Sequence, residues 1–163
     1  MHIPIATIAA YFAIGIEAGV CTDDNARDWA FAVIGAVDEP PGEIIDVSWR
    51  QPRMQLIAHL KAVPGVADRR LAGHWLLGRL YSSITAEERL WPLLRCAKHI
   101  VNAMDLGDEL YYAIDMVEDN LEMAERGIWG TAPEAAEDFH ALLKVFPLPP
   151  FKDGWSDIIF DVT

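Results

Sequence analysis

The sequence predicts an all-α protein, a compact bundle or short stack of six to seven helices, and it allows a short strand near the C-terminus. Apolar residues recur at intervals of three and four along most of the chain, helix-capping residues precede several of these stretches, and Pro/Gly clusters separate them. The chain has 163 residues, of which 52% are hydrophobic and 23% charged. Such a length and composition suit one domain with its own core, so we predict a single helical domain over residues 1–163.

The N-terminal segment, residues 3–16, is apolar and predicts a buried helix. The following Ala18-Gly19-Val20-Cys21 is similar to a lipoprotein cleavage site, but no basic residues precede the apolar run and Glu17 interrupts it. The run is also too short to cross a bilayer. Two cysteines without metal-ligand spacing suit a reducing compartment. We therefore expect a cytoplasmic protein with no membrane partner.

A second helix is expected from Thr22 to Val37, with Thr22 or Asp23 as its cap. Its apolar stripe consists of Ala26, Trp29, Ala30, Val33, Ile34 and Val37. Residues 40–42, Pro-Pro-Gly, end this helix because proline lacks an amide donor and disfavours a helical conformation in the residue before it. Residues 43–49 are too few to classify by periodicity, and a strand or a single helical turn would both fit.

Two further helices are expected between residues 52 and 80. The first has Pro52 in its first turn and ends at Pro64-Gly65, and the second begins at Asp68. Their apolar faces are Met54, Leu56, Ile57, Leu60 and Val63 in the first, and Leu71, Trp75, Leu76, Leu77 and Leu80 in the second.

The next helix is expected to begin at Thr85, because Thr85 and Glu88 have the spacing of a capping box. Pro92 lies two turns later and predicts either a kink or a restart of the helix at Leu93. The apolar face continues through Leu90, Leu93, Leu94, Ala97, Ile100, Val101 and Met104.

The most regular helix of the chain is predicted from Asp108 to Arg126, and Gly127 is placed to end it. Its buried stripe is Leu110, Ile114, Val117, Leu121 and Ala124. A second capping box, Thr131 with Glu134, opens a last helix through Phe146. The last dozen residues are too apolar for a free tail, so we expect them to pack onto the helices.

The net charge of −12 is distributed unevenly. Residues 1–49 carry one basic and eight acidic side chains, residues 50–99 nine basic and three acidic, and residues 100–138 one basic and eleven acidic. A surface this acidic repels phosphates and favours basic protein partners, so no nucleic-acid partner is expected. Alternatively, the basic middle segment pairs with the acidic flanks inside the fold.

The face of the 108–126 helix opposite its apolar stripe is the candidate partner-binding site. It carries Asp115, Glu118, Asp119, Glu122 and Glu125. Like charges three and four residues apart disfavour a helix by a few tenths of a kcal/mol per pair, so helix formation does not call for this arrangement, whereas a basic partner would. Tyr112 and Trp129 flank the acids as candidate interface anchors, with core packing as the alternative for each ring. A merely solvated face is the alternative for the acids.

No catalytic motif was found, and no catalytic residue, metal ligand or cofactor is predicted. Glu137 and His140 have the Glu-x-x-His spacing of carboxylate-bridged di-metal sites, but such sites need two copies and two further glutamates. The glycines in apolar runs match no phosphate-binding motif and are expected to permit close helix contacts instead. They are Gly15, Gly19, Gly35, Gly73 and Gly78. A small helical metal enzyme, built on Glu137, His140 and the carboxylates of the 108–126 helix, is kept as an alternative.

The first third of the chain contains an ordered series of features: Tyr11, Gly19, Trp29-Ala30, Ile34, Pro40-Pro41, Ile44-Ile45-Asp46 and Ser48. This order resembles that of small bacterial immunity proteins of polymorphic-toxin and contact-dependent growth inhibition systems. The resemblance implies a non-enzymatic inhibitor that binds the C-terminal domain of a cognate toxin, frequently a basic nuclease. The alternative is a helical adaptor in another protein assembly.

Overall fold

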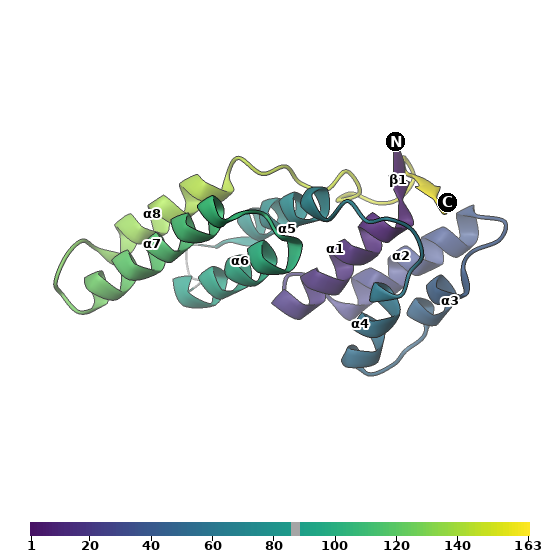
Figure 1. The fold of residues 1–163 in the computed structure, drawn as a ribbon, viewed down its shortest axis with the longest axis horizontal. Coiled ribbons are helices and arrows are strands. Elements are labelled where there is room, and N and C mark those ends of the chain that lie inside the picture. The colour runs from purple at the N-terminus through teal and green to yellow at the C-terminus, as the bar shows by residue number, and fades with distance from the viewer. Residues whose placement is uncertain (86–88) are drawn as a thin grey trace.

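The computed structural model describes residues 1–85 and 89–163. Within them lie eight helices and a two-stranded sheet, which confirms the all-α prediction (Figure 1). The elements are β1 (His2–Pro4), α1 (Ile5–Ala18), α2 (Asp23–Ala36), α3 (Gly42–Ser48), α4 (Arg53–Lys61), α5 (Arg69–Ser83), α6 (Leu90–Met104), α7 (Asp108–Glu125), α8 (Ala132–Leu143) and β2 (Ile159–Asp161). The helix count exceeds the predicted six to seven, because most of the unclassified segment 43–49 belongs to a helix, α3.

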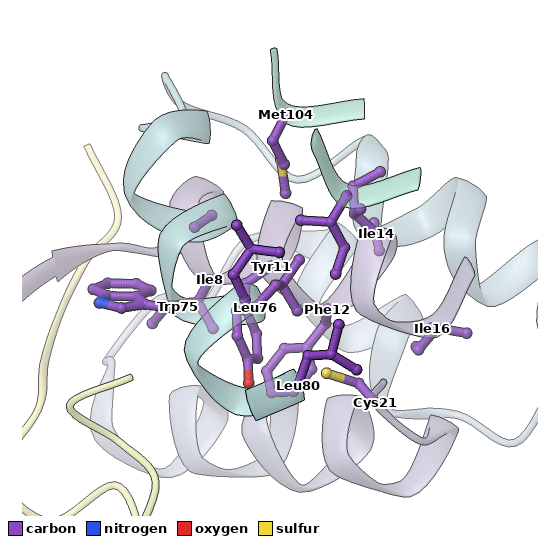
Figure 2. Packing of buried hydrophobic residues seen from close by; sticks show 14 of the residues in the cluster. Ile8, Tyr11, Phe12, Ile14, Ile16, Cys21, Trp75, Leu76, Leu80 and Met104 are labelled. Atoms are coloured by element: carbon purple, nitrogen blue, oxygen red, sulfur yellow. The ribbon is translucent and has the colours of Figure 1, made fainter. Parts of the chain in front are cut away.

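Helix α1 forms the centre of the core and packs against α2, α4, α5 and α6. It is buried on nearly all of its faces, as its apolar sequence predicts. Tyr11 and Phe12 of α1 belong to the same buried cluster as Leu76 and Leu80 of α5 (Figure 2). The buried hydroxyl of Thr7 accepts a hydrogen bond from the backbone amide of Asp68, at 2.9 Å, which satisfies this polar group inside the core.

The first residues of the chain differ from the prediction of a helix beginning at residue 3. Strand β1 precedes α1, since Pro4 is the N-cap and disfavours a helical conformation for Ile3. β1 pairs in parallel with β2, with Ile3 opposite Phe160. The C-terminal residues therefore pack as expected, and their strand brings the two ends of the chain together (Figure 1).

Helix α2 has the predicted cap. The hydroxyl of Thr22 accepts a hydrogen bond from the amide of Asn25, and the Asn25 side chain accepts one from the amide of Thr22, which forms a capping box. Trp29 and Ala30 are fully buried. In α3, Ile44 and Val47 are buried one helical turn apart, so this helix is stabilised by packing against α2 rather than by its length.

The predicted apolar faces of α4 and α5 are confirmed except at one residue each. Met54 is 78% exposed because it lies two residues from Leu56, on the opposite side of the helix. Leu71, in the first turn of α5, is also exposed. Asp68 caps α5 as predicted, with its carboxylate accepting a hydrogen bond from the amide of Leu71 at 3.0 Å.

Helix α6 begins at Leu90, so Pro92 lies in its first turn, where the missing amide donor breaks no helical hydrogen bond. The predicted restart at Leu93 was therefore three residues too late, and no kink is needed. The proposed capping box of Thr85 and Glu88 extends into residues 86–88, which lie outside the described residues.

Helices α7 and α8 form a hairpin at the opposite end of the long axis from the sheet (Figure 1). Ile114, Val117 and Leu121 form the buried stripe of α7. Gly127 ends this helix with a positive φ of 69°, a conformation that glycine adopts readily. The hydroxyl of Thr131 accepts a hydrogen bond from the amide of Glu134 at 3.3 Å and caps α8, as predicted.

Candidate partner-binding surface

The α7–α8 hairpin, residues 108–143, concentrates negative charge. It contains ten acidic residues and one basic residue, Arg126. Most of the predicted site residues lie on α7, and Trp129 lies in the turn that leads to α8. The structure divides these residues into two groups according to the side of α7 that they occupy.

The first group faces α6 and is bound to it. The ammonium of Lys98 on α6 lies 2.6 Å from the carboxylate of Asp115 and 2.9 Å from that of Glu118. It also lies 4.9 Å from the centre of the Tyr111 ring, a cation–π contact. Hydrogen bonds with Asp115 and Glu118 hold the pKa of Lys98 well above its ordinary value. These two acids therefore join α6 to α7, and their charge is partly compensated.

Glu125 also contacts α6, because its carboxylate accepts a hydrogen bond from the indole N–H of Trp91 at 2.9 Å. Glu122 is exposed and lies 3.7 Å from Arg126, one turn along the helix. Asp119 is exposed, and no ion pair within residues 1–85 and 89–163 involves it. The five acids thus do not form one uniform solvent-facing set.

The second group lies on the face of α7 opposite its buried stripe and in the turn that follows the helix. Tyr112 is 65% exposed, and Trp129 beyond the end of the helix is 61% exposed, so neither ring is a core residue. Sequence reasoning missed Met116 and Met123, which are exposed on the same face of α7. The signal was present, since residues 112, 116, 119 and 123 are separated by four, three and four positions and therefore share one helix face.

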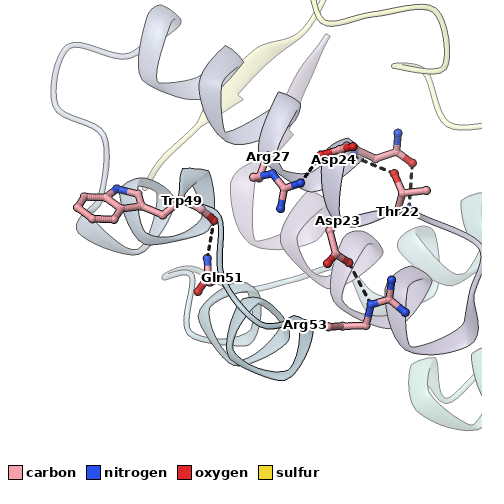
Figure 3. A network of polar contacts seen from close by, with 8 residues as sticks. Thr22, Asp23, Asp24, Arg27, Trp49, Gln51 and Arg53 are labelled. Carbon is pink, nitrogen blue, oxygen red and sulfur yellow. Dashed lines mark hydrogen bonds and ion pairs between the residues drawn. The ribbon is translucent and has the colours of Figure 1, made fainter.

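Part of the basic middle segment pairs with the acidic flanks. Lys61 lies 2.6 Å and His99 3.0 Å from the carboxylate oxygens of Glu17. Arg53 reaches from α4 to Asp23 at the start of α2, at 3.1 Å (Figure 3). Burial raises the pKa of Glu17, but hydrogen bonds with Lys61 and His99 lower it, and the pKa lies below its ordinary value. The internal-pairing alternative accounts for these basic residues, and it leaves the hairpin acidic.

Glu137 and His140 lie on α8. Glu137 is exposed, and the His140 ring packs edge-on near Tyr81, with ring centres 6.4 Å apart. Among the described residues, no group of three or more His, Cys, Asp or Glu side chains is arranged to hold a metal ion. The structure therefore does not gather Glu137, His140 and the α7 carboxylates into one cluster.

Three comparisons with known proteins were made: with family models, with curated proteins and with solved structures. None finds a match. In the part of the chain that the structure describes, no helix combines the length and apolar character needed to cross a bilayer.

Replacing Lys98 with alanine should lower the free energy of unfolding by about 1–2 kcal/mol, because Asp115 and Glu118 would then repel each other without their shared cation. The pKa of Lys98 is raised in the folded state, so its contribution is fully present at pH 7 and is lost only above about pH 10.4. Urea unfolding at pH 7 measures the effect. Lys144→Ala is the matched control, because Lys144 is exposed and belongs to no ion pair within the described residues. Equal losses in the two variants would contradict the prediction.

Proposed function

We propose that this chain is a bacterial immunity protein, a cytoplasmic non-enzymatic inhibitor that binds the C-terminal domain of a cognate toxin through its α7–α8 hairpin. The order of features in the first third of the chain supports the family. The negative charge of the hairpin supports the hairpin as the binding site and is the main observation behind the proposal. Lys98 compensates Asp115 and Glu118, but Asp108, Glu109 and Asp119 have no basic partner within the described residues.

A basic toxin, such as a nuclease, fits this surface. The groove of a nuclease that accepts a phosphate backbone is lined with cations, and a helix that carries carboxylates can occupy the same groove. Opposite charges would speed association, and the buried centre of the contact would set the residence time. Inhibition then requires no bond to be made or broken by the immunity protein.

Reversing the charge of two exposed hairpin acids tests this proposal. The proposal expects a large toxin gene immediately upstream of the gene for this chain. The C-terminal domain of that toxin is the probe, produced in a host whose growth it arrests. Asp119→Lys with Glu122→Lys should abolish protection and slow association by about tenfold or more at low salt. Glu118 is left unchanged because Glu118→Lys would place a second ammonium beside that of Lys98.

Asp38→Lys with Glu39→Lys makes the matched control, since both acids are exposed and lie between α2 and α3. This variant changes the net charge equally and should protect as wild type does. Full protection by the Asp119/Glu122 variant would show that the interface does not lie on the hairpin. If wild type neither binds nor neutralises the neighbouring domain, the immunity function is wrong and a helical adaptor becomes the better proposal.

A further inference from the structure

The face of α7 opposite its buried stripe carries large apolar side chains that are exposed to solvent. We call Tyr112, Met116, Asp119 and Met123 the α7 crest. Tyr112 and Met116 are 65% and 64% exposed, and Met123 is 39% exposed. These side chains take no part in the packing of α7 into the core, because the helix buries Ile114, Val117 and Leu121 on its opposite side.

Exposed apolar residues in a row, surrounded by charged ones, are typical of a protein contact. The crest extends over twelve residues, from Tyr112 to Met123, which corresponds to about 16 Å along the helix axis. Its spacing is that of a helix that inserts into a groove of another protein. Methionine side chains are flexible and polarizable, so they adapt their shape to the apolar surface against which they pack. The crest thus has the properties of the apolar centre of an interface.

The charge around the crest identifies the kind of partner. A second copy of the hairpin would bring ten acidic residues against ten, which opposes self-association at this face. Phosphates of nucleic acids and anionic lipids are repelled for the same reason. A groove with an apolar floor and a basic rim complements both the apolar side chains of the crest and the carboxylates beside them.

We infer that the α7 crest inserts into a groove of the toxin that has an apolar floor and a basic rim, with Tyr112 and Met116 as anchors. The inference rests on the proposed function and goes beyond it, because it assigns the binding energy to apolar residues rather than to the five acids alone. Asp119 lies within the crest and meets the basic rim. Asp115 and Glu118, held by Lys98, keep α7 fixed against α6, so little ordering is needed on binding.

Methionine-methyl NMR tests the inference directly. The chain has five methionines, and four of them report on three distinct environments: Met116 and Met123 on the crest, Met54 exposed on α4, and Met104 buried in the core. Protein labelled with methyl-¹³C-methionine is titrated with the same upstream-encoded toxin domain. The resonances of Met116 and Met123 should shift and broaden, whereas those of Met54 and Met104 should stay in place.

Substitution gives an independent measure. Tyr112→Ser with Met116→Ser should raise the Kd for the toxin domain by about tenfold or more, and Met54→Ser should leave the Kd unchanged. All three side chains are exposed, so the variants should unfold at the same urea concentration as wild type.

The possible outcomes separate the two proposals. Binding by wild type with unchanged Met116 and Met123 resonances, or with an unchanged Kd in the double-serine variant, would overturn the crest as the contact and leave the immunity function standing. Absence of any binding or neutralisation by wild type would overturn the immunity function itself. A shift of the Met54 resonance instead would place the contact at α4.

Discussion

Replacement of Gly78 by alanine should lower the free energy of unfolding by about 3 kcal/mol. Gly78 lies in α5 where the segment after α8 crosses the helix. A Cβ atom at this position would lie 2.1 Å from the carbonyl oxygen and 2.6 Å from the carbonyl carbon of Pro147. These are backbone atoms, which cannot rotate aside as a side chain can. One element must therefore move, and the packing between α5 and the C-terminal segment is lost.

Gly35 in α2 provides the matched control. A Cβ atom there would have no neighbour within 4 Å, and the residue is exposed within a helix. Gly35→Ala should therefore leave stability unchanged or raise it by up to about 1 kcal/mol, since alanine favours the helical conformation. Urea unfolding monitored by circular dichroism measures both variants. If Gly78→Ala were as stable as wild type, the close crossing of residue 147 over α5 would be wrong.

The two glycines show where sequence reasoning reaches its limit. The interpretation that glycines in apolar runs permit close contacts is correct for Gly78 and for Gly73, whose added Cβ would meet Leu106 and Met104 at 2.9 Å. It is wrong for Gly35, which has open space beside it. Nothing in the local sequence separates these cases, because the contact is made by segments distant in the chain.

The helices themselves were largely predictable because their signals are local. Thr22, Asp68 and Thr131 cap helices through residues three positions later, and these pairs are visible in the sequence. Helix α3 was not assignable, since two buried residues in a segment of seven fit a strand as well as a helix. The strand β1 depends on pairing with residues 159–161 at the other end of the chain.

The candidate surface was predictable in position but not in detail. The periodicity of α7 separates its buried stripe from its polar side. This division is confirmed at Ile114, Val117 and Leu121, whereas Leu110 and Ala124, predicted in the same stripe, are only half-buried. It does not reveal which acids meet a cation, because Lys98 comes from α6 and its position depends on how the two helices cross. An emphasis on charge also hid Met116 and Met123, although their spacing from Tyr112 and Asp119 places them opposite the predicted buried stripe.

The second large effect is expected at Trp29, which belongs to the pattern that resembles immunity proteins. Its side chain is fully buried, and its ring lies 5.7 Å from that of Phe12. Trp29→Ala should lower the free energy of unfolding by about 3–5 kcal/mol, because it leaves a cavity between α1 and α2. Thermal and urea unfolding measure this loss, and a decrease below about 1 kcal/mol would contradict the burial of the ring.

Trp29→Phe distinguishes a core role from a binding role for the same residue. Phenylalanine keeps an aromatic ring beside Phe12 and removes the indole N–H, which is buried without a hydrogen-bond partner in the described part of the chain. The loss of the hydrogen-bond donor therefore costs little, and the remaining cost of about 1–2 kcal/mol comes from the smaller volume. Under the proposed immunity function, this variant should still fold and should protect against the toxin domain as wild type does. A folded Trp29→Phe protein that no longer binds the toxin would instead make this tryptophan part of the recognition surface, although no solvent reaches it in the free protein.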